Sequence, residues 1–332
     1  MRRLPRDWPL SLLIAFAWWS AASCGGGAPS SPSAQTVPVP VPVHVKLSGH
    51  VTATMTDRLL AGLAVALNTG QATQTDGTGA FTFDLVQNDI RVNHLTLDGP
   101  SIVSRGITLA APSTRDINVD AIEAQAPFDL GFYRFLVRNG FESPTLEPLR
   151  RWVQSPMIYI RTVDDSEASI PNASLNLVAS VLTDTLPRWT NQRFSVAGIE
   201  TGTETREGKS GWLTVRWAVT DARCGSAVVG RDGGYIELRS PRGTLCNCNG
   251  AIRARTVRHE LGHALGFWHT GDASDLMSGL SVAGCDQLPS ARELYHANIA
   301  YSRPFGNVDP DADPPAATTL VAKAFRAKVI VD

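Results

Sequence analysis

The sequence lacks any strong excess of charge. Its 332 residues contain 30 Lys and Arg against 31 Asp and Glu, which gives a formal net charge of −1. Beyond the first few residues there is no run of basic side chains. Affinity for a phosphate backbone requires clustered Lys and Arg. The composition therefore excludes a nucleic-acid-binding protein.

Long apolar runs are also missing. The stretch 10–19 (LSLLIAFAWW) is shorter than the roughly 20 apolar residues that a membrane-spanning helix needs. Arg2, Arg3 and Arg6 precede this stretch and small residues follow it, which is typical of an export signal. We therefore predict that residues 1–23 are a signal peptide.

Cys24 follows the small residues 20–23 (SAAS). This arrangement resembles the lipobox of bacterial lipoproteins, in which the cysteine carries a lipid and begins the mature protein. It departs from that pattern at Ala21, where leucine is usual, and the alternative is an ordinary signal peptide cut after Ala22 or nearby. Residues 24–43, rich in Pro and Ser, predict an extended linker. We expect an extracytoplasmic protein, lipid-anchored to a bacterial cell envelope or otherwise secreted.

Cysteine is scarce beyond Cys24, with only Cys224, Cys246, Cys248 and Cys285 remaining. An even count in an exported protein predicts disulfide bonds. Cys246 and Cys248 are too close in sequence to pair comfortably with each other. We expect one of these two to pair with Cys224 and the other with Cys285, and the sequence leaves both assignments open.

Residues 44–122 contain short alternating apolar runs separated by turn-forming residues. Three such runs lie at 43–47, 63–67 and 80–85. Closely spaced short strands predict a small all-β sandwich. The run 75–83 (TDGTGAFTF) resembles a segment of carboxypeptidase-regulatory-like domains, which implies an accessory domain without chemistry of its own.

Residues 127–309 contain both strand-like alternation and helix-like spacing of apolar residues, which predicts a domain of the α+β class. Strands are predicted at 157–161, 212–219 and 235–239, and helices at 172–189, 252–267 and 290–301. Asn172 is the predicted N-cap of the first helix. Residues 310–332 are predicted to be a C-terminal tail. The acidic run 309–313 is interpreted as a solvated linker, with weak calcium binding as the alternative.

The candidate chemistry lies in residues 259–269 (HELGHALGFWH). On a helix, His259 and His263 project from one face, close enough to share a metal ion. Gly266 can adopt the left-handed conformation that ends a helix, so that the chain turns back and presents His269 as the third ligand. Three neutral imidazoles leave one position open for water, which is the arrangement of catalytic zinc.

Glu260 adjoins the first predicted ligand and is the candidate general base. Zinc lowers the pKa of a bound water toward about 7. Glu260 would accept the proton of that water, whose oxygen attacks a peptide carbonyl, and would then return the proton to the leaving amine.

This stretch is similar to the signature of the metzincin zinc peptidases, H-E-x-x-H-x-x-G-x-x-H followed by a Met-turn. Met277 supplies the methionine of that turn, which in the family packs beneath the metal without binding it. The resemblance covers about residues 157–301. It implies a twisted mixed sheet, an active-site helix, one catalytic Zn2+, and in some members structural Ca2+. Residues 233–239 stand where the family has the edge strand that pairs with substrate; an ordinary internal strand is the alternative.

We therefore expect a monomeric, matrixin-like zinc endopeptidase of unassigned subfamily, acting on a protein or peptide substrate. One alternative is a surface protein that retains the metzincin fold and holds zinc without cleaving peptides. The intact Glu260 argues against it, because a domain without catalysis has no need of this carboxylate. Another alternative is an adhesin in which residues 44–122 are the functional part.

Overall fold

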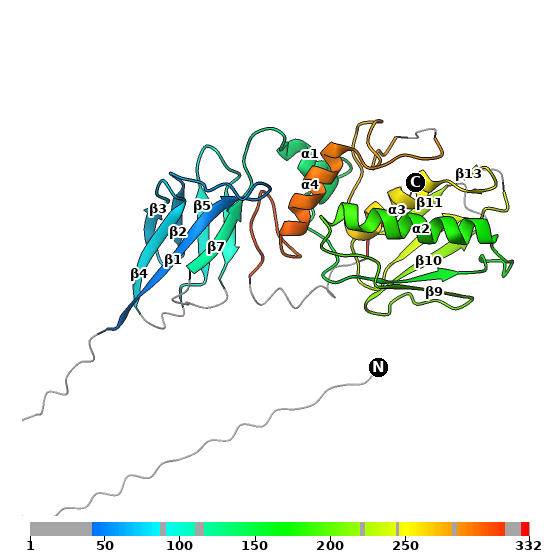
Figure 1. The fold of residues 1–332 in the computed structure, drawn as a ribbon, viewed down its shortest axis with the longest axis horizontal. Helices are drawn as coiled ribbons and strands as arrows, with labels where there is room; N and C mark the ends of the chain where they lie inside the picture. The colour runs from blue at the N-terminus through cyan, green and yellow to red at the C-terminus, as the bar shows by residue number, and fades with distance from the viewer. Residues whose placement is uncertain are drawn as a thin grey trace, which may run out of the picture. The chain divides into compact units, whose positions relative to one another are not determined.

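The structure, a computed structural model, describes residues 42–86, 91–109, 116–219, 223–243, 246–280, 284–315 and 327–331 (Figure 1). This part of the chain is a mixed α+β protein with four helices and several β-sheets, which confirms the predicted class. The predicted signal peptide and Cys24 lie outside the described residues. None of the described helices combines the length and the apolar character that crossing a membrane requires.

The first seven strands form two small sheets, in the orders β4-β1-β7 and β3-β2-β5-β6. Their bounds are His44–Ala53 (β1), Ala64–Leu67 (β2), Ala72–Gln74 (β3), Ala80–Val86 (β4), His94–Asp98 (β5), Arg105–Thr108 (β6) and Asp116–Ala121 (β7). Buried and exposed side chains alternate along β4 and β5, and the buried ones from both sheets join one apolar core. The predicted strands at 43–47, 63–67 and 80–85 correspond to β1, β2 and β4.

The turn before β4 is specified by its own side chains. The Asp76 carboxylate accepts hydrogen bonds from the backbone amides of Thr78 (2.8 Å) and Ala80 (3.0 Å) and from the Thr78 hydroxyl. Gly79 has a φ of +72°, and a Cβ at this position would lie 2.9 Å from the carbonyl oxygen of Val51. The run that prompted the family resemblance is thus a tight turn that needs Asp and Gly at these positions.

A six-stranded sheet has the order β15-β11-β12-β10-β8-β9. Its strands are Met157–Arg161 (β8), Gly198–Gly202 (β9), Trp212–Ala218 (β10), Gly225–Val228 (β11), Tyr235–Arg239 (β12) and Val329–Val331 (β15). The four strands β9, β8, β10 and β12 are parallel, whereas β11 runs antiparallel to β12 and β15 antiparallel to β11. β8, β10 and β12 agree with the predicted strands to within one residue.

The prediction that residues 233–239 form the edge strand is wrong. β12 lies inside the sheet, hydrogen-bonded to β10 on one side and to β11 on the other. The alternation of buried and half-buried side chains along Tyr235–Arg239 is as common in an internal strand as at an edge. The antiparallel strand that follows β12 outward is β11, whose four residues are all buried.

The helices are Leu130–Arg138 (α1), Asn172–Trp189 (α2), Ala254–Leu265 (α3) and Ala291–Ser302 (α4), and a hairpin of β13 (Asn247–Cys248) and β14 (Ala251–Ile252) precedes α3. α2 has the predicted bounds, but Asn172 is not its N-cap: Pro171 holds that position and no side chain caps the helix. α4 begins with a capping box made by Ser290 and Glu293. α2, α3 and the sheet share the main apolar core, and Figure 1 shows α2 lying across the strands.

The acidic run 309–313 is not the solvated linker that the sequence suggested. Asp311 is buried and accepts hydrogen bonds from Arg105 (3.1 Å) and Arg303 (2.7 Å). Arg303 is also buried and donates to Asp120 in β7 (2.5 Å). Burial alone would lower the pKa of Arg303, but these carboxylates raise it above its ordinary value. The run therefore packs against the first seven strands through paired charges.

Candidate metal centre

Helix α3 brings two of the three predicted ligands together, and the loop after it adds the third. The Nε2 atoms of His259 and His263 are 3.1 Å apart. The Nε2 atom of His269 lies 3.2 Å from that of His263 and 3.3 Å from that of His259. All three side chains are buried.

Gly266 ends α3 as predicted. It has a φ of +112°, and its backbone amide donates to the carbonyl oxygen of His263 (2.8 Å). A Cβ at this position would lie 1.9 Å from the carbonyl oxygen of Arg150. Both the left-handed backbone and this close approach require glycine. The sharp reversal at Gly266 is what allows His269 to face the helix.

The Nδ1 atom of each histidine has an oxygen acceptor. The acceptors are the carbonyl oxygen of Leu276 for His259 (2.6 Å), the carbonyl oxygen of Phe267 for His263 (2.8 Å), and Oε1 of Glu142 for His269 (2.5 Å). Because these oxygens can only accept, each Nδ1 must carry the proton. In a neutral ring Nε2 then keeps a lone pair, and the three Nε2 atoms lie within 3.3 Å of one another.

The converging nitrogens fit a metal ion. Zinc–nitrogen bonds of about 2.0 to 2.1 Å in a tetrahedral arrangement place two nitrogens about 3.3 to 3.4 Å apart. The observed separations of 3.1 to 3.3 Å are close to that value. A cation also removes the repulsion between facing lone pairs. The triad can therefore bind a metal ion, and no other group of three ligand side chains with suitable spacing occurs in the described part of the chain.

Met277 packs against helix α3, which carries His259 and His263. It is fully buried, and a Cβ placed on Gly262 would lie 2.3 Å from its Sδ atom. The backbone amide of Thr270 donates to the carbonyl oxygen of Met277 (2.7 Å), and the amide of Gly279 donates to that of Thr270 (3.1 Å). The methionine thus sits in a closed loop whose packing depends on a residue without a side chain at position 262.

Glu293 supports this loop and was not predicted. Its carboxylate accepts hydrogen bonds from the amides of Met277 (2.7 Å), Leu276 (3.1 Å) and Ser290 (2.7 Å). Burial raises the pKa of Glu293, although these amides oppose the change. The Ser290-x-x-Glu293 spacing of a capping box was the available signal in the sequence. Since Leu276 is also the acceptor for His259, Glu293 fixes a backbone segment that orients a candidate ligand.

Glu260 is buried on α3 beside His259 and faces β11. A Cβ placed on Gly225, the first residue of β11, would lie 2.3 Å from Oε1 of Glu260. The strand therefore passes directly over this carboxylate, and glycine is what permits the close approach. The structure brings the candidate general base, the ligand helix and the antiparallel strand β11 into one place.

Glu142 is a second carboxylate at the site that the sequence did not reveal. It follows α1, which ends at Asn139 in the left-handed conformation. The ring of Phe141 lies 2.8 Å from the position that a Cβ on Gly271 would take, so this segment packs on the loop that carries His269. Glu142 and His269 are 127 residues apart, and no local pattern connects them.

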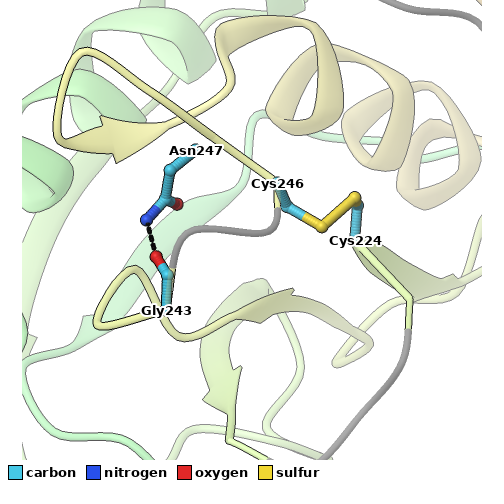
Figure 2. The surroundings of a disulfide bond; sticks show 4 residues. All are labelled: Cys224, Gly243, Cys246 and Asn247. Atoms are coloured by element: carbon cyan, nitrogen blue, oxygen red, sulfur yellow. Dashed lines mark hydrogen bonds between the residues drawn. A yellow bond between two sulfur atoms is a disulfide. The ribbon is translucent and has the colours of Figure 1, made fainter.

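Two disulfide bonds are present, Cys224–Cys246 and Cys248–Cys285, which settles the pairing that the sequence left open. Figure 2 shows the first bond, beside a hydrogen bond that the side-chain amide (Nδ2) of Asn247 donates to the carbonyl oxygen of Gly243. Cys224 directly precedes β11. Disulfides are typical of proteins outside the cytoplasm, which supports the predicted location in its coarser form.

The remaining described histidines do not join the site. His44, His50 and His94 belong to the strands of the first two sheets. His296 is buried in α4, where its Nδ1 donates to the carbonyl oxygen of Arg292 (2.8 Å) and its Nε2 accepts from the amide of Asp129 (2.9 Å). It therefore has a structural role.

The site thus consists of three converging imidazoles, a buried glutamate on the same helix and a strand that crosses over that glutamate. A comparison of the whole chain with known protein families and with curated proteins found no match.

Proposed function

We propose that this protein is a zinc-dependent endopeptidase of the metzincin type, with His259, His263 and His269 as metal ligands and Glu260 as general base. The observation that carries the proposal is the convergence of three buried Nε2 atoms, two of them from a helix on which Glu260, next to His259 in the sequence, is also buried. Structural zinc sites use four protein ligands, whereas three leave a position for water or substrate. The described residues supply three.

A zinc ion held by the triad would act as a Lewis acid that lowers the pKa of a water molecule and polarises a peptide carbonyl. Glu260 would accept one proton from the attacking water on a carboxylate oxygen. As the water oxygen bonds to the carbonyl carbon and the C–N bond breaks, Glu260 would deliver that proton to the leaving nitrogen. Burial of Glu260 keeps bulk water away from this transfer.

The correction of the sheet order moves the proposed substrate-pairing strand from β12 to β11. An extended peptide hydrogen-bonded antiparallel to β11 would run alongside the strand whose Gly225 lies against the Glu260 carboxylate. Main-chain hydrogen bonds form with any peptide sequence, which suits an enzyme acting on proteins or peptides. The second sheet edge, at β9, is four strands away from β11 in the sheet.

The proposal extends to the rest of the chain. The two sheets of the first seven strands, with their common core, would be an accessory β-sandwich of the carboxypeptidase-regulatory-like type. The two disulfides support an extracytoplasmic location. Lipidation at Cys24 remains part of this proposal.

The test compares the chain from residue 24 onward, with Cys24→Ser, and its Glu260→Ala variant. A Glu167→Ala variant is the matched control, since the side chain of Glu167 is 72% exposed. We expect peptide release from a denatured protein substrate by the parent and the control. Glu260→Ala should bind the same amount of zinc and release no peptide.

The possible results separate the alternatives. Zinc in every variant with cleavage in none would favour the non-catalytic zinc-binding protein. Absence of zinc from the parent after refolding with the metal would refute the metal site itself. Cleavage that persists in Glu260→Ala would remove Glu260 from the mechanism.

A further inference from the structure

Strand β15 occupies the outer edge of β11. The two strands pair antiparallel, with Ser226 opposite Val331 and Val228 opposite Val329. The amide of Val229 adds a hydrogen bond to the carbonyl oxygen of Lys328 (2.9 Å). Since β12 takes the other edge of β11, both edges of this strand are filled by the chain itself.

The strand whose outer edge β15 fills lies against the candidate metal centre. Gly225, one residue before Ser226, lies against the Glu260 carboxylate. At the other end of β11, the amide of Gly230 donates to the carbonyl oxygen of His263 (3.0 Å). A strand edge has one row of donors and acceptors and accepts only one partner strand. A peptide pairing with β11 and β15 pairing with β11 therefore exclude each other.

Few contacts hold β15 in place. Ile330 is 7% exposed and packs with Val229 and Trp268, the residue before His269. Lys328 forms an ion pair with Glu147, and its side chain is 43% exposed. Val329 is 45% exposed. The strand has only three paired residues and contributes no side chain to the main apolar core, so it can leave without disturbing that core.

We infer that β15 is an internal competitor that occupies the substrate-pairing edge of β11, so that a substrate peptide must displace it. The effect on substrate access rests on the proposed peptidase function, whereas the pairing of β15 with β11 does not. The antiparallel direction of β15 is the direction in which a peptide would pair with β11. Access of an extended peptide to Glu260 is then set by the fraction of molecules in which β15 has left the edge.

The experiment uses the chain from residue 24 onward and weakens β15 by substitution. Ile330→Asp places a carboxylate against Val229 and Trp268, and Lys328→Glu, a second variant in case the first does not fold, opposes Glu147. Val329→Ser is the matched control, because it changes an exposed side chain of the same strand. All variants also carry Glu260→Ala, so that no peptide is cleaved.

The probe is a fluorescent peptide with the sequence of residues 327–331, and its binding is followed by anisotropy. If β15 leaves the edge in less than a tenth of parent molecules, opening it tightens the apparent Kd at least about tenfold. We expect that change in Ile330→Asp or Lys328→Glu and not in Val329→Ser. Equal affinities in the parent and in a folded opened variant would overturn the inference.

A second readout separates this inference from the proposed function. With Glu260 restored, the opened variants should cleave an unstructured peptide with a kcat/KM about tenfold higher than the parent. If no variant cleaves but the opened ones bind the probe more tightly, the competitor role stands and the peptidase proposal fails. If cleavage occurs with equal kcat/KM and equal probe affinity, the peptidase proposal stands and the competitor role fails.

Discussion

Oε1 of Glu142 lies 2.5 Å from Nδ1 of His269, so a carboxylate outside the ligand helix orients the third ring of the triad. The other two rings are oriented by backbone carbonyl oxygens. A carboxylate partner makes the imidazole a more basic ligand and fixes its tautomer. Glu142 is thus a positioning residue for the candidate metal centre.

Glu142→Ala should weaken metal binding by about 10- to 100-fold, the usual effect of losing such a partner. Glu142→Gln, which keeps an oxygen acceptor without the charge, should lie between the parent and Glu142→Ala. Zinc affinity is measured by competition with a chromophoric chelator, independently of any catalytic activity. Equal zinc affinity in all three proteins would show that the contact with His269 has no effect on the site.

Gly262→Ala should destabilise the protein by about 1 to 3 kcal/mol, because the new methyl group collides with the buried Met277 side chain. Met277→Ala alone should cost about 2 to 5 kcal/mol through the cavity that it leaves. The double variant should be less destabilised than the sum, since each substitution makes room for the other. Denaturant unfolding of the four proteins measures this coupling, and strictly additive losses would contradict the contact.

Asp164 should make stability depend on acid pH. Burial of the carboxylate alone would raise its pKa. Hydrogen bonds from Ser166, Ala168, Ser240 and Arg242 outweigh this effect and lower the pKa to about 2. In the unfolded chain its pKa returns to about 3.9. The stabilisation is therefore fully present above pH 4 and is lost as the pH falls toward 2.

Asp164→Asn should accordingly lower the free energy of unfolding at pH 7 by about 1 to 2 kcal/mol, allowing for solvent screening at Arg242. The difference from the parent should shrink between pH 4 and pH 2 in urea titrations. Asp184→Asn, at a carboxylate whose side chain is 50% exposed, serves as control and should change little. A difference that stays constant with pH would show that hydrogen bonding to the ionised Asp164 is not its source.

The sequence predicted the parts of the site that are encoded locally. The ligands on α3, Gly266 and Met277 lie within 20 residues of one another. Helix geometry relates the two ligands to each other and to Gly266, and the motif of the resembled family includes Met277. Glu142 could not be found in this way, because it is brought near only when the segment after α1 packs on the loop that carries His269. The assignment of residues 127–309 to the metzincin fold stays a prediction, because it depends on how distant strands and helices pack and no local motif specifies that packing.

The order of the strands in the sheet was harder to predict from the sequence than their positions along the chain. β8, β10 and β12 were located because each is at least five residues long and has several aliphatic or aromatic side chains. β11 has only four small or β-branched residues, and β15 three, so neither shows a clear period. Which strand lies at an edge depends on pairing between distant segments, and the wrong assignment of 233–239 followed from that.

The Cys224–Cys246 bond also has a consequence for the timing of assembly. It joins the residue before β11 to Cys246, whose carbonyl oxygen accepts from the amide of Arg253 just ahead of α3. A chain that is still reduced lacks this link between the strand over Glu260 and the helix that carries it. In a compartment that keeps thiols reduced, β11 and α3 would therefore be held together only by packing and hydrogen bonds, without this covalent tie.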